Sequence, residues 1–158
     1  MPTESSPSVA VLTGPVHSGK TTRLMTRAAS QPSLGGIVSS QEGATRWFRD
    51  LRDLAAVPMD ASAEAPEETV QRVGRFRFRT GAFFWAAERM ESAFADPAVT
   101  TVVLDEVGPL ELRGLGFAPW LPRWIAAHGD RLLLVVRDEV IVDISDHFGF
   151  IPQPEVVA

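Results

Sequence analysis

The chain has 158 residues, a length that suits one domain with its own core, and 45% of the residues are apolar. The net charge of −5 argues against nucleic acid as the main partner, because phosphate backbones bind to a basic face. The absence of cysteine excludes disulfides and cysteine-bound zinc and fits a reducing, cytoplasmic setting, and no stretch approaches the roughly 18 apolar residues of a membrane span.

The first eight residues are polar and lack the apolar core of a signal peptide. We therefore expect a disordered N-terminal tail over residues 1–8, followed by a single folded domain over residues 9–158. The domain begins with a short apolar run at residues 9–12, which predicts a buried parallel strand.

A glycine-rich segment follows this strand and leads into a predicted helix over residues 19–30. It has the G-x-x-x-x-G-K-[ST] spacing of a phosphate-binding loop, in which inward-pointing amides and a helix N-terminus hold an anion. Lys20, the one lysine of the chain, is expected to reach the β- and γ-phosphates of a nucleotide. The predicted nucleotide-binding residues are Gly14, Pro15, Val16, His17, Ser18, Gly19, Lys20, Thr21 and Thr22.

The middle of the chain predicts strands more than helices. Residues 34–39 are predicted to form a second strand, residues 45–51 to pair back as a hairpin arm, and most of 53–70 to be a loop. Residues 73–79 alternate, which places two phenylalanines on one face and three arginines, Arg75, Arg77 and Arg79, on the other. We interpret the arginine face as a solvated sheet face, with an anion-binding or subunit-contact surface as the alternative.

A predicted helix over residues 82–95 leads to a buried strand over 101–104, which ends in two adjacent acids, Asp105 and Glu106. The carboxyl ends of parallel strands carry the active loops of such sheets, so this pair is expected beside the phosphate loop. Asp105 and the Thr21 hydroxyl are the predicted Mg²⁺ ligands, and Glu106 is predicted to accept a proton from an attacking water.

The last third predicts a helix over residues 117–128, a buried strand over 131–136, a helix over 138–148 and a short strand at 156–157. Positive charge on the γ-phosphate helps its bond to break. Arg137, at the end of a strand, and Arg113, in the loop past the acids, are each candidates for this role, and a surface ion pair is an equal alternative for each.

Apolar strands that alternate with helices predict an α/β fold, a mostly parallel sheet with helices on both faces. Residues 45–79 are predicted to be an antiparallel hairpin addition to this sheet.

These motifs together resemble one known group of proteins. The phosphate loop, the run Gly74-Arg75-Phe76-Arg77-Phe78 and above all residues 103–112, VLDEVGPLEL, are similar to the small nucleoside-triphosphatase family, described from thermophiles and from an animal branch called cancer-related nucleoside-triphosphatase. The resemblance covers roughly residues 9–148. Residues 41–72 are shorter than the corresponding region of that family, so base or partner contacts made there are not carried over.

The resemblance implies a RecA-like P-loop NTPase fold and slow, Mg²⁺-dependent hydrolysis of ATP, GTP and related triphosphates with little preference for the base. It also implies that Glu106 is the catalytic carboxylate. Two alternatives stay open: a small-molecule or nucleotide kinase that uses the same loop, and a nucleotide-binding switch or adaptor without enzymatic activity. The expected partner is a nucleoside triphosphate, and the expected state is a monomer or weak homo-oligomer.

Overall fold

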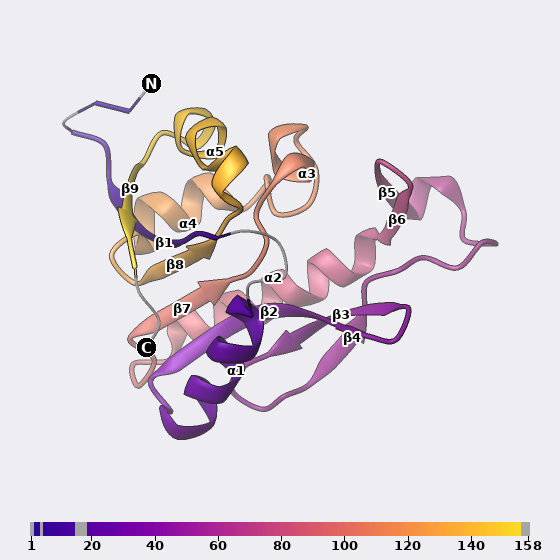
Figure 1. The fold of residues 1–158 in the computed structure, drawn as a ribbon, viewed down its shortest axis with the longest axis horizontal. Helices are drawn as coiled ribbons and strands as arrows, with labels where there is room; N and C mark the ends of the chain where they lie inside the picture. Colours follow the sequence, from indigo (N-terminus) through magenta and orange to yellow (C-terminus); the bar gives the residue numbers. More distant parts are fainter. Residues whose placement is uncertain (1, 4, 15–18, 156–158) are drawn as a thin grey trace.

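The computed structural model describes residues 2–3, 5–14 and 19–155. In this part of the chain a seven-stranded central sheet has the order β4-β3-β2-β7-β8-β1-β9 (Figure 1). The strands are β1 (Ser8–Leu12), β2 (Leu34–Glu42), β3 (Thr45–Asp50), β4 (Ala56–Pro58), β7 (Thr101–Leu104), β8 (Leu132–Val135) and β9 (Ile151–Pro154). The last five strands of this order, β2-β7-β8-β1-β9, run parallel to one another, whereas β3 and β4 pair antiparallel at one edge.

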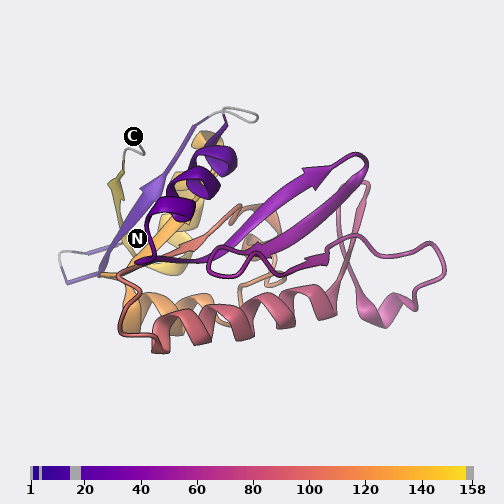
Figure 2. The ribbon, with the colours of Figure 1, turned by 90° about the horizontal axis from the view of Figure 1, so that it is seen from below.

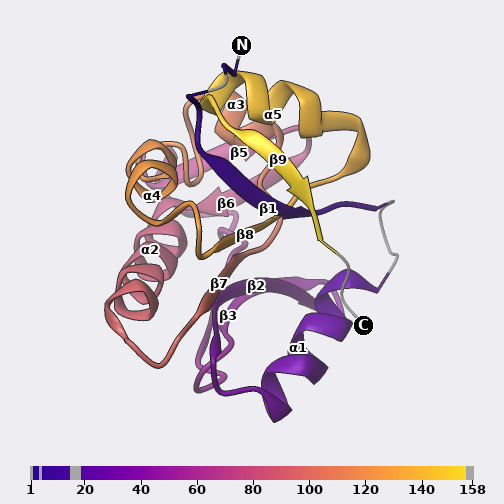
Figure 3. The ribbon, with the colours of Figure 1, turned by 90° about the vertical axis from the view of Figure 1, so that its left-hand side faces the viewer.

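Helices cover both faces of the sheet. They are α1 (Lys20–Ser30), α2 (Thr80–Ala95), α3 (Pro109–Leu112), α4 (Leu121–His128) and α5 (Ile141–Phe148). Seen end-on, α1 lies against one face, whereas α2 and α4 lie against the other (Figure 3). The fold predicted from the alternating strands and helices is therefore confirmed.

The alternation of side chains in β7 explains why both faces need cover. Val102 and Leu104 belong to the larger core, which α2, α4 and α5 complete. Val103 points the other way, into a smaller core with Leu24 of α1 and Leu133 of β8. A strand that is apolar at successive positions can be stable only between two layers of helices.

The antiparallel addition is confirmed, with a different division into strands. The predicted strand over residues 73–79 is wrong as one element, because a turn at Gly74 and Arg75 divides it into β5 (Val70–Val73) and β6 (Phe76–Arg79). Gly74 has a φ of +56°, which glycine adopts without strain. The loop predicted over 53–70 contains β4 and a short 3₁₀ turn at Glu67–Thr69. Figure 2 shows this addition projecting beyond the helices.

Three boundaries in the last third also differ from the predictions. The helix predicted from residue 117 begins at Leu121, and residues 138–140 form a 3₁₀ turn before α5 begins at Ile141. A final strand exists at Ile151–Pro154, parallel to β1, and the strand suggested at 156–157 lies outside the described residues.

The described helices include none that is long and apolar enough to cross a membrane.

Candidate active site

The two ends of the phosphate loop come together at the carboxyl end of β1. Residues 15–18 of the predicted loop lie outside the described residues. Gly19 has a φ of +82° and immediately precedes α1, so the chain enters the helix through a conformation that favours glycine. The Lys20 ammonium donates a hydrogen bond to the Gly14 carbonyl at 3.1 Å and thereby spans the loop.

Asp105 lies directly beside this loop. The Thr21 hydroxyl donates a hydrogen bond to Asp105 Oδ2 at 2.7 Å, and the Ser39 amide donates to the same oxygen at 3.1 Å. Burial, and then the charge of Glu106, raises the pKa of Asp105 to about 7, although both hydrogen bonds oppose the shift. The structure thus brings Thr21 and Asp105 together, as expected from the ends of parallel strands.

Glu106 has an unusual backbone conformation and an exposed side chain. Its φ of +60° lies in the left-handed region, which costs a non-glycine residue roughly 1 kcal/mol or more. The next amide, that of Val107, donates to the Val135 carbonyl at 3.1 Å and ties this turn to the end of β8. Backbone strain of this kind gathers at functional sites, where it fixes the direction of a side chain.

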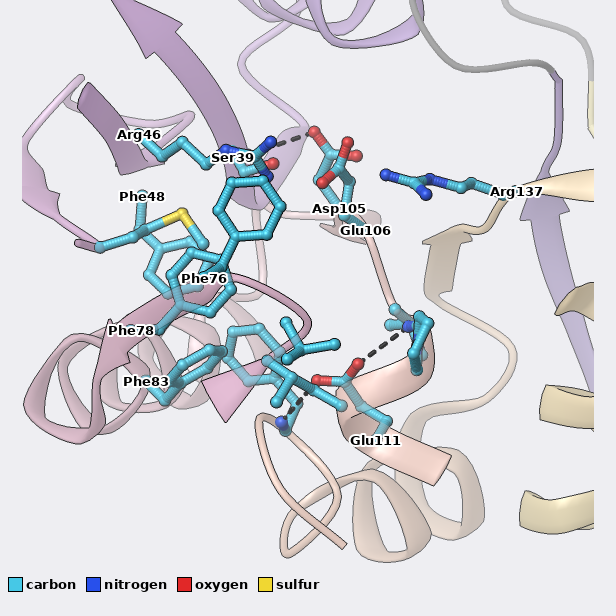
Figure 4. A pocket seen from close by; sticks show the side chains of 17 residues that line it. Ser39, Arg46, Phe48, Phe76, Phe78, Phe83, Asp105, Glu106, Glu111 and Arg137 are labelled. Atoms are coloured by element: carbon cyan, nitrogen blue, oxygen red, sulfur yellow. Dashed lines mark hydrogen bonds between the residues drawn. The ribbon is translucent and has the colours of Figure 1, made fainter. Parts of the chain in front are cut away.

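A pocket of about 330 Å³ joins these elements. We call it the phosphate pocket; it is lined by Gly19, Lys20, Thr21, Thr22, Met25, Ser39, Ser40, Gln41, Arg46, Asp105, Glu106, Val135, Val136 and Arg137. Arg137 lies just past the end of β8, half-buried, and its guanidinium points toward Glu106 (Figure 4).

Arg113 occupies a different place from Arg137. Its side chain is exposed, and its guanidinium donates to the Arg72 carbonyl of β5 at 3.1 Å. Arg113 is absent from the lining of the phosphate pocket. Of the two arginines considered for the γ-phosphate, the pocket therefore contains Arg137.

Sequence reasoning missed Arg46, which reaches the same acids from the opposite side (Figure 4). β2 continues past the end of β7, and the hairpin returns so that Arg46 pairs with Gln41 beyond the sheet edge. The available signal was the predicted hairpin itself, because the first residues of its return arm must lie at the carboxyl edge of the sheet. The role of Ser39 was also missed, because Ser39 contributes only its backbone amide.

Glu111 is buried below the acidic pair and holds the intervening loop in shape. Its carboxylate accepts hydrogen bonds from the Gly108 amide at 2.8 Å and the Phe117 amide at 2.9 Å. Burial raises the pKa of Glu111 to about 7 against the opposing effect of these bonds. The side chain therefore connects the turn after Glu106 with the start of the segment that leads to α4.

The arginines of β6 brace the chain next to it. Arg77 donates to the carbonyls of Ser62 and Ala65 and pairs with Glu67, and Arg79 donates to the Pro58 carbonyl at 2.8 Å. These two guanidinium groups therefore hold the loop between β4 and β5, instead of forming the solvated face that we predicted.

The donors at this edge suit a divalent cation. Among the described residues, the buried Asp105 Oδ1 is one of the side-chain atoms that has no hydrogen-bond partner. A buried carboxylate oxygen without a partner is costly, and a hard cation such as Mg²⁺ prefers oxygen ligands of this type. Thr21 and Asp105 therefore fit the metal role expected of them.

A strand, a glycine-rich turn closed by a lysine, a helix, and a buried acid bonded to the first helical threonine define a P-loop nucleotide-binding protein. Comparison with protein families agrees with this class. The chain belongs to the family described as NTPase, whose profile matches residues 9–149. No curated protein matches the sequence.

Two solved structures share the fold. THEP1 from the hyperthermophile Aquifex aeolicus superposes with a TM-score of 0.68 at 13% identity, over 93% of this chain and 88% of that one. A human cancer-related nucleoside triphosphatase superposes with a TM-score of 0.65 at 19% identity, over 94% of this chain and 89% of that one. At these identities the likeness concerns the fold.

Proposed function

We propose that this protein hydrolyses nucleoside 5′-triphosphates to diphosphate and phosphate in a Mg²⁺-dependent reaction. The observation that carries the proposal is the hydrogen bond of 2.7 Å from Thr21 in the phosphate loop to the buried Asp105, next to Glu106 at the mouth of the same pocket. Membership of the NTPase family supports the activity. Turnover is proposed to be slow, with little preference among the bases, as the resemblance to the nucleoside-triphosphatase family implies.

Nucleotide binding is assigned to the loop and the start of α1. The phosphates are assigned to the backbone amides of the loop, and the N-terminus of α1 adds favourable partial charge. Lys20 contacts the β- and γ-phosphates as a compact point charge, a role for which arginine is poorly shaped. Thr22 lines the pocket, and its hydroxyl is assigned to an α-phosphate oxygen.

Thr21 and Asp105 would hold Mg²⁺, which supplies positive charge to the bound phosphates. Glu106 orients a water molecule toward the γ-phosphorus and takes its proton as the water oxygen bonds to phosphorus. The bond from the γ-phosphorus to the bridging oxygen breaks, and its electron pair stays with the diphosphate. Arg137 is assigned the charge that develops on the γ-phosphate, because it lines the pocket just past the end of β8 and its guanidinium points toward Glu106 (Figure 4).

The proposed setting is the cytoplasm, with a monomer or weak homo-oligomer as the working form and no role for nucleic acid. The acidic balance, a net charge of −5, supports the last point.

The test is phosphate release from ATP, GTP, CTP and UTP, with Mg²⁺ or with excess EDTA, together with the affinity for each nucleotide. We expect metal-dependent release from all four and a much weaker affinity in Lys20→Ala. A Lys20→Ala variant that binds as tightly as the wild type would contradict the assignment of the loop. Tight binding with turnover far below about 0.001 per second would instead indicate a switch or adaptor.

A further inference from the structure

A second pocket, of about 160 Å³, opens on the far side of the acidic pair from the phosphate loop. We call it the aromatic pocket, because five phenylalanines line it: Phe48, Phe76, Phe78, Phe83 and Phe117. It shares five residues with the phosphate pocket, namely Ser39, Arg46, Asp105, Glu106 and Arg137. Lys20 and Thr21 line only the phosphate pocket and not the aromatic pocket. The two pockets therefore meet at the acids.

The walls of the aromatic pocket are already formed. Phe83 of α2 packs edge-on against both Phe48 and Phe117, with ring centroids 5.2 Å apart in each pair. Phe76 stacks on Phe78 at 5.8 Å, and the Arg46 guanidinium lies over the Phe76 ring at 4.4 Å. Rings held in this way by their neighbours need little reorganisation to accept a ligand.

Polar and apolar groups are separated along the pocket. The charged side chains Arg46, Glu106 and Arg137 gather at one end, and the phenylalanine rings lie below them (Figure 4). At the other end, both oxygens of Glu111 already accept amide hydrogen bonds. An occupant that fits must therefore be apolar in its body and polar at the end that faces Glu106.

The volume limits the size of that body. A cavity of about 150 Å³ lined by apolar side chains holds one benzene molecule. At about 160 Å³ the aromatic pocket therefore has room for one six-membered ring and is too small for a nucleoside.

We propose that the aromatic pocket binds a second substrate, a single-ring alcohol or phenol, whose hydroxyl group lies beside Glu106 and accepts the γ-phosphoryl group in place of water. This inference rests on the proposed function, because it uses the same bound triphosphate and the same acid. It adds an acceptor to the reaction and thereby makes the protein a phosphotransferase.

The transfer step balances without any further reactant. The hydroxyl oxygen of the acceptor forms a bond to the γ-phosphorus, and its proton passes to the Glu106 carboxylate and then to solvent. The bond between the γ-phosphorus and the bridging oxygen breaks, and the electron pair remains on the nucleoside diphosphate. The products are a phosphate monoester of the ring compound and the diphosphate.

The probes are phenol, benzyl alcohol and 2-phenylethanol, which carry the hydroxyl at three distances from one ring. Their binding to the nucleotide-free protein is measured by saturation-transfer NMR, and their conversion with Mg²⁺ and ATP is followed by ³¹P NMR. We expect binding of the ring compounds and a monoester signal from at least one of them. Toluene, which has no hydroxyl group, should compete for binding and reduce the yield of ester.

Two substitutions in the pocket have matched controls on the surface. Val73 lines the pocket at a half-buried position, so Val73→Trp should fill it and weaken probe binding by about tenfold or more. Val142→Trp makes the same change at a side chain that is 66% exposed on α5 and should leave probe binding as in the wild type. Should Val73→Trp not fold, Phe76→Ala removes a wall, with the exposed Phe84→Ala as its control.

The outcomes separate this inference from the proposed function. Free phosphate without ester from all three alcohols overturns the acceptor proposal and leaves hydrolysis standing. If the protein produces neither free phosphate nor ester, both the acceptor proposal and the proposed function are overturned. If Val73→Trp and Phe76→Ala leave probe binding unchanged, the probe does not bind in the aromatic pocket.

Discussion

At the scale of single residues, Glu106 combines an exposed carboxylate with a left-handed backbone. We expect Glu106→Gln to lower turnover by about 10²–10⁴-fold, because a neutral amide cannot take the proton of the attacking group. Nucleotide affinity should stay near that of the wild type, since Glu106 is assigned to the reacting water and not to the phosphates. Steady-state phosphate release and a nucleotide titration measure the two effects separately.

The control for this substitution is Glu88→Gln, at an exposed glutamate of α2 outside the lining of both pockets. It makes the same chemical change on the surface and should leave turnover and affinity as they are. Unchanged turnover in Glu106→Gln would remove Glu106 from the mechanism.

At the scale of elements, the loop from β7 to α4 depends on the buried Glu111. We expect Glu111→Gln to lower the free energy of unfolding by about 1–3 kcal/mol at pH 4.5, because the amide NH₂ cannot accept the hydrogen bond that a carboxyl oxygen accepts. Urea unfolding followed by circular dichroism measures this difference.

The advantage of the wild type over Glu111→Gln should shrink as the pH rises. Burial raises the pKa of Glu111 from 4.5 to about 7 in the folded protein. Between these values the folded state holds a proton that the unfolded state has released, so the wild type loses stability with rising pH. The loss is on the order of 3 kcal/mol and levels off above pH 7. A difference that stays constant from pH 4.5 to 7.5 would contradict the raised pKa, and Glu88→Gln should show no trend.

The elements also show how far the sequence could predict the site. Asp105 was predictable beside Thr21, because parallel strands that end in polar residues present them at one edge. The aromatic pocket was not, because its rings come from β3, β6, α2 and residue 117, and only the three-dimensional arrangement brings these segments together. The alternation of residues 73–79 predicted one strand, whereas Gly74 allows a turn that alternation alone cannot reveal.

At the scale of the whole molecule, the sheet depends on close contact between β2 and β7. Gly36 of β2 has a φ of +108° and is paired with Val103, and an added Cβ would lie 2.1 Å from the Val103 carbonyl oxygen. We therefore expect Gly36→Ala to lower the free energy of unfolding by about 3 kcal/mol or more. Chemical denaturation monitored by tryptophan fluorescence measures the loss.

Gly43→Ala is the matched control. Gly43 also has a positive φ, +62°, but an added Cβ there would meet nothing within 4 Å. The expected cost is about 1 kcal/mol, from the left-handed backbone alone. Equal losses in the two variants would mean that β2 and β7 can separate without cost to the fold.

The contact between Lys20 and the Gly14 carbonyl has a practical consequence for studies of this protein. Lys20 carries the one side-chain amine in the whole chain, and there is no thiol to compete for electrophiles. An amine-directed acylating reagent therefore has a single side-chain target, which lies inside the phosphate loop. Bound nucleotide would protect Lys20 from acylation. The degree of protection, measured by mass spectrometry of the digested chain, would report nucleotide occupancy in the unaltered protein.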